Sequence, residues 1–188
     1  MENVKMNEHI AHLDLLRKDV SETQKKGLPF IMASVVIWAV ILLAQFSGKN
    51  IETINLYSFM SSSLLMPLSF MFSKAVKADI FRKSDNPVSK LGFLCTVNQM
   101  LYLVIVMWAF SARPDAMLML YAIVFGAHLL PFGWVYKNKS YMLIAIIETL
   151  GALLTNIHWG NAATCIFMVI MEIILCIFLV SDIRKGRR

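Results

Sequence analysis

Six long apolar segments dominate this chain and leave few folds open to it. They cover residues 28–46, 54–72, 91–110, 116–136, 141–157 and 162–180. A helix needs roughly 20 apolar residues to cross the hydrocarbon core of a bilayer, and each segment is close to that length. Lipid offers no water to backbone N–H and C=O groups, and the alternating pattern of membrane strands is absent. The sequence therefore predicts an all-α integral membrane bundle of six transmembrane helices.

The composition agrees with a membrane protein of one domain. Of the 188 residues, 58% are hydrophobic and 16% are charged. An ordinary soluble domain has about half apolar and about a quarter charged residues. We expect a cytoplasmic amphipathic N-terminal segment at 1–27, a six-helix transmembrane domain at 28–182 and a basic cytoplasmic tail at 183–188. The first apolar segment is longer than a signal-peptide core, so we expect it to be retained.

The lysine and arginine residues predict the orientation. The N-terminal segment, the connections at 73–90 and 137–140 and the C-terminus hold sixteen of the eighteen, and only Lys49 and Arg113 fall on the other side. Cytoplasmic loops carry the excess of basic residues, so both termini are predicted to be cytoplasmic in the cell membrane. This placement also accounts for the net charge of +6 without a nucleic-acid partner.

The connections divide the chain into three helical hairpins in series. A short polar turn at 156–161 joins the last two segments. The longest connection, 73–90, is predicted to extend the second helix along the membrane surface over 74–83 before Asp85-Asn86-Pro87 breaks it. Prolines at similar positions in the second and fourth segments are compatible with a serial repeat, although topology alone would produce much of the likeness.

The N-terminal segment has a weak helical pattern. Ile10, Leu13, Leu16 and Val20 recur at three- and four-residue steps. Two interpretations stay open: a surface helix that touches the membrane or a partner, and a solvated tail with one apolar stripe. His9 and His12 share a face, but a zinc site needs three or four ligands, so we expect no metal there.

Polar residues within the apolar segments are the candidate functional residues. Glu148 and Glu172 each lie near the middle of a segment, and His128, Asn98 and Gln99 lie in two others. All five are about 7 to 9 residues from the predicted cytoplasmic ends, roughly 11 to 14 Å at 1.5 Å per residue. The sequence therefore predicts one polar layer near the middle of the bilayer.

Two functions are compatible with this layer. Ionisable residues inside a membrane often mark ion or proton pathways, which favours a small transporter or channel that binds a proton or cation. The same groups also form hydrogen bonds that hold helices together, which suits a non-transporting accessory, immunity or sensor protein. Expected partners are the bilayer and a small solute or cation. Association into a homo-oligomer stays open, without a GxxxG motif to specify an interface.

Enzymatic function has little support in the sequence. No HExxH, GxSxG, P-loop or GxGxxG motif occurs, so we expect neither an enzyme nor a cofactor. A membrane-embedded enzyme that uses a Glu/His pair for acid–base work is the weakest alternative.

Three stretches carry a resemblance to other proteins. KKGLPFIMASVVIW from Lys25, NQMLYLVIVMW from Asn98 and HLLPFGWVY from His128 resemble a group of small bacterial multi-pass membrane proteins with no assigned activity. The likeness spans most of the chain. It implies a bacterial cytoplasmic membrane and adds no substrate.

Overall fold

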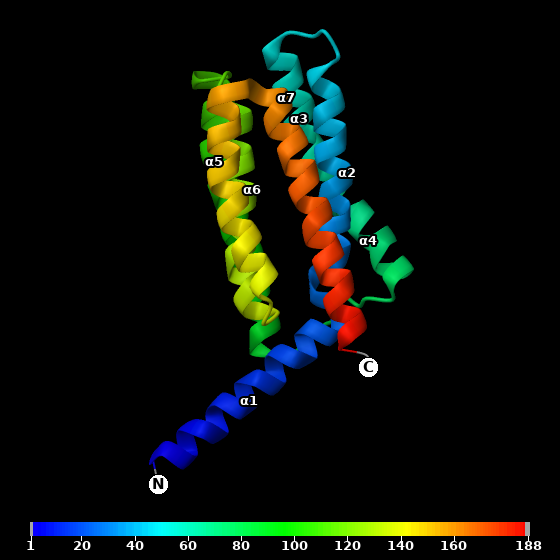
Figure 1. The fold of residues 1–188 in the computed structure, drawn as a ribbon, viewed down its shortest axis with the longest axis vertical. Helices are drawn as coiled ribbons and strands as arrows, with labels where there is room; N and C mark the ends of the chain where they lie inside the picture. Colours follow the sequence, from blue (N-terminus) through cyan, green and yellow to red (C-terminus); the bar gives the residue numbers. More distant parts are fainter. Residues whose placement is uncertain (1, 187–188) are drawn as a thin grey trace.

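A computed structural model describes residues 2–186 as an elongated helical bundle (Figure 1). The helices are α1 (Glu2–Thr23), α2 (Leu28–Gln45), α3 (Ile51–Ser61), α4 (Leu65–Val76), α5 (Pro87–Ala112), α6 (Met117–Val135) and α7 (Lys139–Lys185), with 3-10 turns η1 (Lys25–Gly27) and η2 (Ser62–Leu64). Helix α1 projects obliquely from the end of the bundle where the C-terminus also lies. The all-α prediction is confirmed.

Five helical stretches are long and apolar enough to cross a membrane, which makes the chain a multi-pass membrane protein by length and composition. Helices α3 and α4, joined by η2, form one of them. Helix α7 has 47 residues, and its backbone leaves the helical region at Gly160. Its two halves, residues 139–159 and 161–185, run side by side in opposite directions (Figure 1). The six helical segments match the six apolar runs of the sequence.

The bend at Gly160 is tighter than the turn that the sequence predicts. Helical structure continues through 156–161 except at Gly160, where φ is 80° and ψ is −171°. Only glycine adopts this region readily, because a Cβ would clash with the backbone. Asn156 Nδ2 donates to Asn161 Oδ1 at 2.8 Å and to Thr164 Oγ1 at 3.2 Å, which ties the two halves together beside the bend.

Helix α7 is the centre of the bundle. It packs against both α2 and α6, whereas α5 packs on α6 and the α3–α4 unit packs on α2. Buried apolar side chains form two clusters, one toward each end of the bundle. Most large side chains of α5 are exposed, as expected for a helix that faces lipid.

The prediction that the second helix extends over 74–83 is wrong. Helix α4 ends at Val76, because Lys77 adopts a left-handed conformation with φ of 56°. Ala78 N donates to Ser73 O at 2.9 Å, which satisfies a carbonyl that the helix leaves free. Lys137 ends α6 in the same way, with a bond of 2.9 Å from Asn138 N to Gly133 O.

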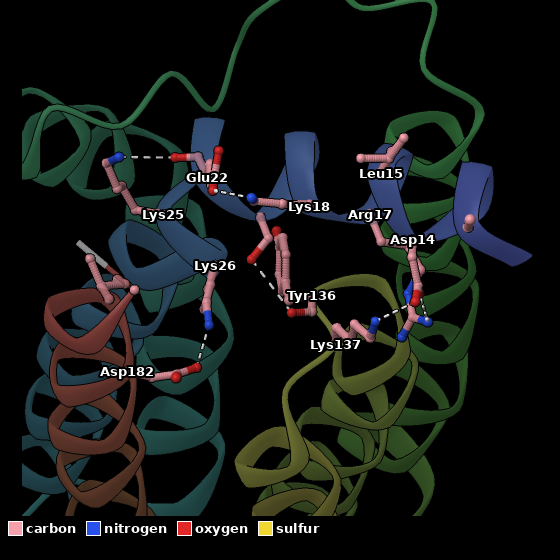
Figure 2. A pocket seen from close by; sticks show the side chains of 14 residues that line it. Asp14, Leu15, Arg17, Lys18, Glu22, Lys25, Lys26, Tyr136, Lys137 and Asp182 are labelled. Carbon is pink, nitrogen blue, oxygen red and sulfur yellow. Dashed lines mark hydrogen bonds and ion pairs between the residues drawn. The ribbon is translucent and has the colours of Figure 1, made fainter. Parts of the chain in front are cut away.

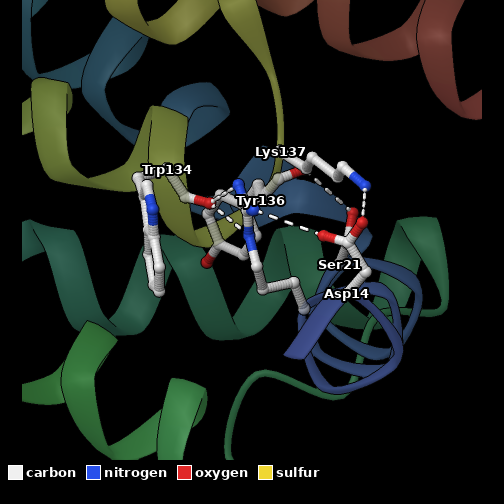
Figure 3. A network of polar contacts seen from close by, with 6 residues as sticks. Asp14, Ser21, Trp134, Tyr136 and Lys137 are labelled. Atoms are coloured by element: carbon white, nitrogen blue, oxygen red, sulfur yellow. Dashed lines mark hydrogen bonds and ion pairs between the residues drawn. The ribbon is translucent and has the colours of Figure 1, made fainter. Parts of the chain in front are cut away.

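Helix α1 docks on the end of α6 (Figure 3). Arg17 donates to Trp134 O at 2.9 Å and 2.5 Å, and its guanidinium lies 4.6 Å from the centre of the Trp134 ring. Trp134 O is among the last carbonyls of α6, where cations bind favourably. Asp14 accepts from Lys137 Nζ at 2.5 Å. Of the predicted apolar stripe, Val20 belongs to the buried core, and Leu16 packs against that core.

The remaining stripe residues do not join that contact. Ile10 is 54% exposed and Leu13 is 37% exposed. The first part of α1 therefore offers an apolar face outside the bundle, and whether that face lies on a membrane or in water stays a prediction.

We expect the docking of α1 to depend on the charge of Asp14. The hydrogen bond from Lys137 lowers the pKa of Asp14 below its ordinary value of 3.8. For a depressed pKa the contact is complete above the ordinary value and is lost as pH falls through the lowered one. Asp14→Asn should therefore speed amide hydrogen exchange in α1 at pH 7. The difference in the hydrogen-exchange rate of α1 between variant and wild type should shrink once the pH is below 3.8.

Asp85→Asn is the matched control, because Asp85 is fully exposed and among residues 2–186 its one ion pair is with Lys90 at 3.5 Å. If both variants changed exchange in α1 equally, the effect would be one of net charge and not of docking.

We expect Gly160→Ala to destabilise the α7 hairpin by about 1–3 kcal/mol through backbone strain alone. Apart from the local backbone, no atom would lie within 4 Å of a Cβ at Gly160, so crowding by the rest of the protein adds nothing. Gly92→Ala lies in helical backbone with 3.9 Å to its nearest neighbours and should be nearly neutral. Reversible unfolding in detergent measures the stability of both variants. Equal stability of the two would contradict the claim that backbone strain at Gly160 destabilises the Gly160→Ala variant.

Candidate functional site

The hairpin of α7 brings Glu148 and Glu172 to one level. Each lies twelve residues from Gly160, one on either half. At 1.5 Å per residue both are about 18 Å from the bend. Both side chains are 0% exposed, and their carboxyl groups are electrostatic neighbours across the hairpin.

Few protein groups satisfy these carboxyl oxygens. Both oxygens of Glu148 and Oε1 of Glu172 lack a hydrogen-bond partner in the described part of the chain. Within residues 2–186 no ion pair includes either glutamate. Two adjacent, buried and unneutralised charges would be very unfavourable in such surroundings. The arrangement therefore suits carboxyl groups that hold at least one proton between them.

Ser34 of α2 supports this protonated state. Its Oγ lies 2.7 Å from Ile31 O and 2.6 Å from Glu172 Oε2. A serine hydroxyl has one proton to donate. When it donates to the carbonyl of its own helix, as helical serines commonly do, the contact with Glu172 needs a proton on the carboxyl group. When Ser34 Oγ instead donates to Glu172 Oε2, the carboxyl group needs no proton, so the protonated state requires that Ser34 donate to Ile31 O.

Helix α6 closes the site behind Glu148. A Cβ on Gly126 would lie 2.8 Å from Glu148 Cβ and 2.9 Å from Thr149 N. A real Cβ atom essentially never has contacts this short, so only glycine lets α6 approach α7 here. The glutamate pair thus sits where α2, α6 and both halves of α7 meet.

The other predicted site residues lie apart from this pair. His128 is half-buried on α6, and its Nδ1 contacts Phe125 O of the same helix. Asn98 is exposed on α5, and Gln99 is half-buried beside it. No hydrogen bond among the described residues joins any of the three to a glutamate. The structure brings together two of the five, and a common binding site for all five stays a prediction.

Ser34 is the partner that sequence reasoning did not include in the site. It is a small polar residue in the first apolar segment, and nothing in the sequence indicates that it faces Glu172. Periodicity indicates which residues share a face of one helix, but it does not indicate which helices become neighbours.

The comparison with protein families identifies a relationship over most of the chain. The model of a family of unknown function, DUF7010, matches residues 13–182. The chain belongs to this family. No curated protein and no solved structure matches it. The matched range of this DUF7010 protein includes the glutamate pair, Ser34 and the docking contacts of α1.

The site of this DUF7010 protein offers two carboxylates and one hydroxyl. Within residues 2–186 no three His, Cys, Asp or Glu side chains gather to hold a metal ion. Chemically, the pair can take up, share and release a proton, or exchange it for a small cation that has lost its water.

We expect Gly126→Ala to disturb the glutamate pair, because the new methyl group would force α6 away from Glu148. Overpacking of this kind costs about 1–3 kcal/mol. Reversible unfolding of the full chain measures the loss. Gly92→Ala, with only ordinary contacts, should leave stability unchanged. The close approach would be unimportant if Gly126→Ala unfolded at the wild-type denaturant concentration.

Proposed function

We propose that this protein is a small transporter or channel of the cytoplasmic membrane in which Glu148 and Glu172 bind a proton or small cation. By the positive-inside rule, the sixteen lysine and arginine residues of the N-terminal segment, the connections at 73–90 and 137–140 and the C-terminus orient it with both termini in the cytoplasm. The six helical segments then cross the bilayer as three hairpins. The proposal involves no catalysed reaction.

The observation that carries the proposal is the pair of buried carboxyl groups, three of whose oxygens receive no hydrogen bond from any other group among residues 2–186. A glutamate that only held helices together would be expected to use its oxygens in hydrogen bonds, since an unmade bond in a buried site is unfavourable. Ionisable side chains that persist in membrane segments at such a cost commonly belong to proton relays or ion pathways.

The enclosure of the pair supports a very small substrate. Both side chains are 0% exposed, and Gly126 brings the α6 backbone against one of them. A proton needs no volume, and a small cation needs only the space of its bare ion. A larger solute would require the helices to separate.

One observation favours the alternative function. Glu172 contacts Ser34 across α2 and α7, as expected of a polar group that links helices. In that case the protein is a non-transporting accessory, immunity or sensor protein, and the glutamates stabilise its fold.

Glu148→Gln and Glu172→Gln distinguish the two functions. Glutamine keeps the size and hydrogen-bonding capacity of glutamate but cannot release a proton. In proteoliposomes with an imposed gradient of protons, Na⁺ or K⁺, we expect the wild type to dissipate at least one gradient and both variants to lose that flux. Stability should change only modestly, by about 0.6 kcal/mol per interhelical hydrogen bond lost.

Glu52→Gln is the matched control, because Glu52 is exposed in the first turn of α3. It should keep full flux. A wild-type protein that dissipates no gradient, with glutamine variants that differ from it in stability alone, would falsify the transporter and favour the structural role.

A further inference from the structure

A pocket of about 770 Å³ opens at the end of the bundle where α1 docks (Figure 2). Five basic and three acidic side chains line it, together with Tyr136 at the end of α6. In Figure 2 Tyr136 lies between two ion pairs, Lys26 with Asp182 and Lys137 with Asp14. The pocket is thus rich in charged side chains and within the size range of ligand-binding clefts.

This pocket lies at one end of the contact between α2 and the two halves of α7, and the glutamate pair lies farther along the same contact, which is called the seam below. Asn138, which caps the start of α7, donates to Asp182 near the end of α7 at 2.8 Å. From this bond both glutamates are ten residues away, one along each half, or about 15 Å. Lys26, the ion-pair partner of Asp182, is eight residues from Ser34, or about 12 Å. Three helical segments therefore lead from the pocket to the pair.

Two tyrosines close the seam behind the pocket. The Tyr136 and Tyr141 rings lie 5.8 Å apart, and their side chains are 4% and 1% exposed. Tyr141 donates to Lys26 O at 2.7 Å, and Tyr136 donates to Gln24 Oε1 at 2.8 Å. Both hydroxyl oxygens would be 3.1 Å from a Cβ on Gly27, so a side chain there would collide with them.

An apolar layer separates the tyrosines from the glutamates. Ile31, Ile144 and Leu175 occupy the intervening turns of the three helical segments, are at most 4% exposed and belong to one cluster. The route from the pocket is therefore closed in the described conformation, and water from the pocket reaches the glutamates only if this layer and the tyrosine pair move.

The corner between α1 and α2 is suited to such a movement. Lys25, Lys26 and Gly27 have φ values of 49°, 53° and 72° in succession. Left-handed conformations are unfavourable at non-glycine residues, so surrounding contacts must hold the two lysines there. Tyr141 supplies one such contact through Lys26 O, and Asp182 supplies another through Lys26 Nζ.

We propose that the pocket is the vestibule of a water path to Glu172 and Glu148, that Tyr136 and Tyr141 are its gate, and that the substrate is the proton. The inference rests on the proposed function for its biological purpose. Two more basic than acidic side chains line the vestibule, which disfavours entry of metal cations. A proton instead passes along hydrogen bonds between water and hydroxyl groups, so it need not enter as a bare ion.

Carboxyl labelling tests the path without requiring transport. The purified full-length protein in detergent is treated with a water-soluble carbodiimide, and modification of Glu172 is measured by mass spectrometry relative to exposed Asp85. Tyr141→Ala should raise labelling about tenfold, the result of easing the opening by about 1.4 kcal/mol. Tyr121→Ala is the matched control, because Tyr121 is a buried tyrosine of α6 that packs on Trp38 in the cluster toward the opposite end. It should leave labelling at the wild-type level.

A second variant distinguishes opening of the gate from loss of folding. Tyr141→Phe keeps the ring and removes only the bond to Lys26 O, so we expect a smaller rise in labelling with an unchanged circular dichroism spectrum. Equal labelling in the Tyr141→Ala and Tyr121→Ala variants would overturn the gate, as would no rise in either Tyr141 variant.

The same measurement separates this inference from the proposed function. A rise in labelling specific to Tyr141 variants, in a protein that dissipates no gradient, would support the path and reject the transporter. If flux depends on the glutamates but labelling of Glu172 is unchanged in the Tyr141 variants, the transporter is supported and this path is rejected. A wild type that dissipates Na⁺ or K⁺ gradients, but not proton gradients, would overturn the assignment of the proton.

Discussion

Two buried, neighbouring carboxyl groups that form no ion pair with any lysine or arginine among residues 2–186 are the feature on which the rest of this structure depends. A charged residue at the centre of a membrane helix costs about 2.5 to 3.5 kcal/mol on the insertion scale, and a large aliphatic residue returns about 0.3 to 0.6 kcal/mol. The long apolar runs of α7 offset this cost, and a retained proton reduces it further. The pair can exist only if the bundle keeps it away from lipid and orders the helices around it.

The neighbouring helices provide that order through small residues. Gly126 lets α6 lie against Glu148, and Ser34 of α2 reaches Glu172 from the other side. Without a hydrophobic force between helices in lipid, close packing and a few polar contacts determine which helices associate. Helix α7 is therefore central because it makes both contacts, and α5, which makes neither, remains on the outside.

The end of the bundle near α1 has a different chemistry. Arg17 binds the free carbonyls at the end of α6, Lys26 pairs with Asp182, and Tyr141 holds the left-handed corner before α2. These contacts join α1 to the same helices that carry the glutamates. A change in the docking of α1 is thus mechanically connected to the seam between the two halves of α7.

The sequence by itself determined the helical class and the six apolar segments, because length and periodicity act within one segment. It misjudged the break after α4, where the backbone conformation of Lys77 decides the outcome, whereas the predicted turn at 156–161 does contain the bend at Gly160. Only the tertiary structure decided which polar residues meet. Asn98 shares the predicted depth of the glutamates yet lies on the outer face of α5, whereas Ser34, Tyr141 and Asp182 converge from distant positions. The physical reason is that depth follows from a residue's distance along its own helix, while contact depends on how that helix is rotated and which neighbour it packs against.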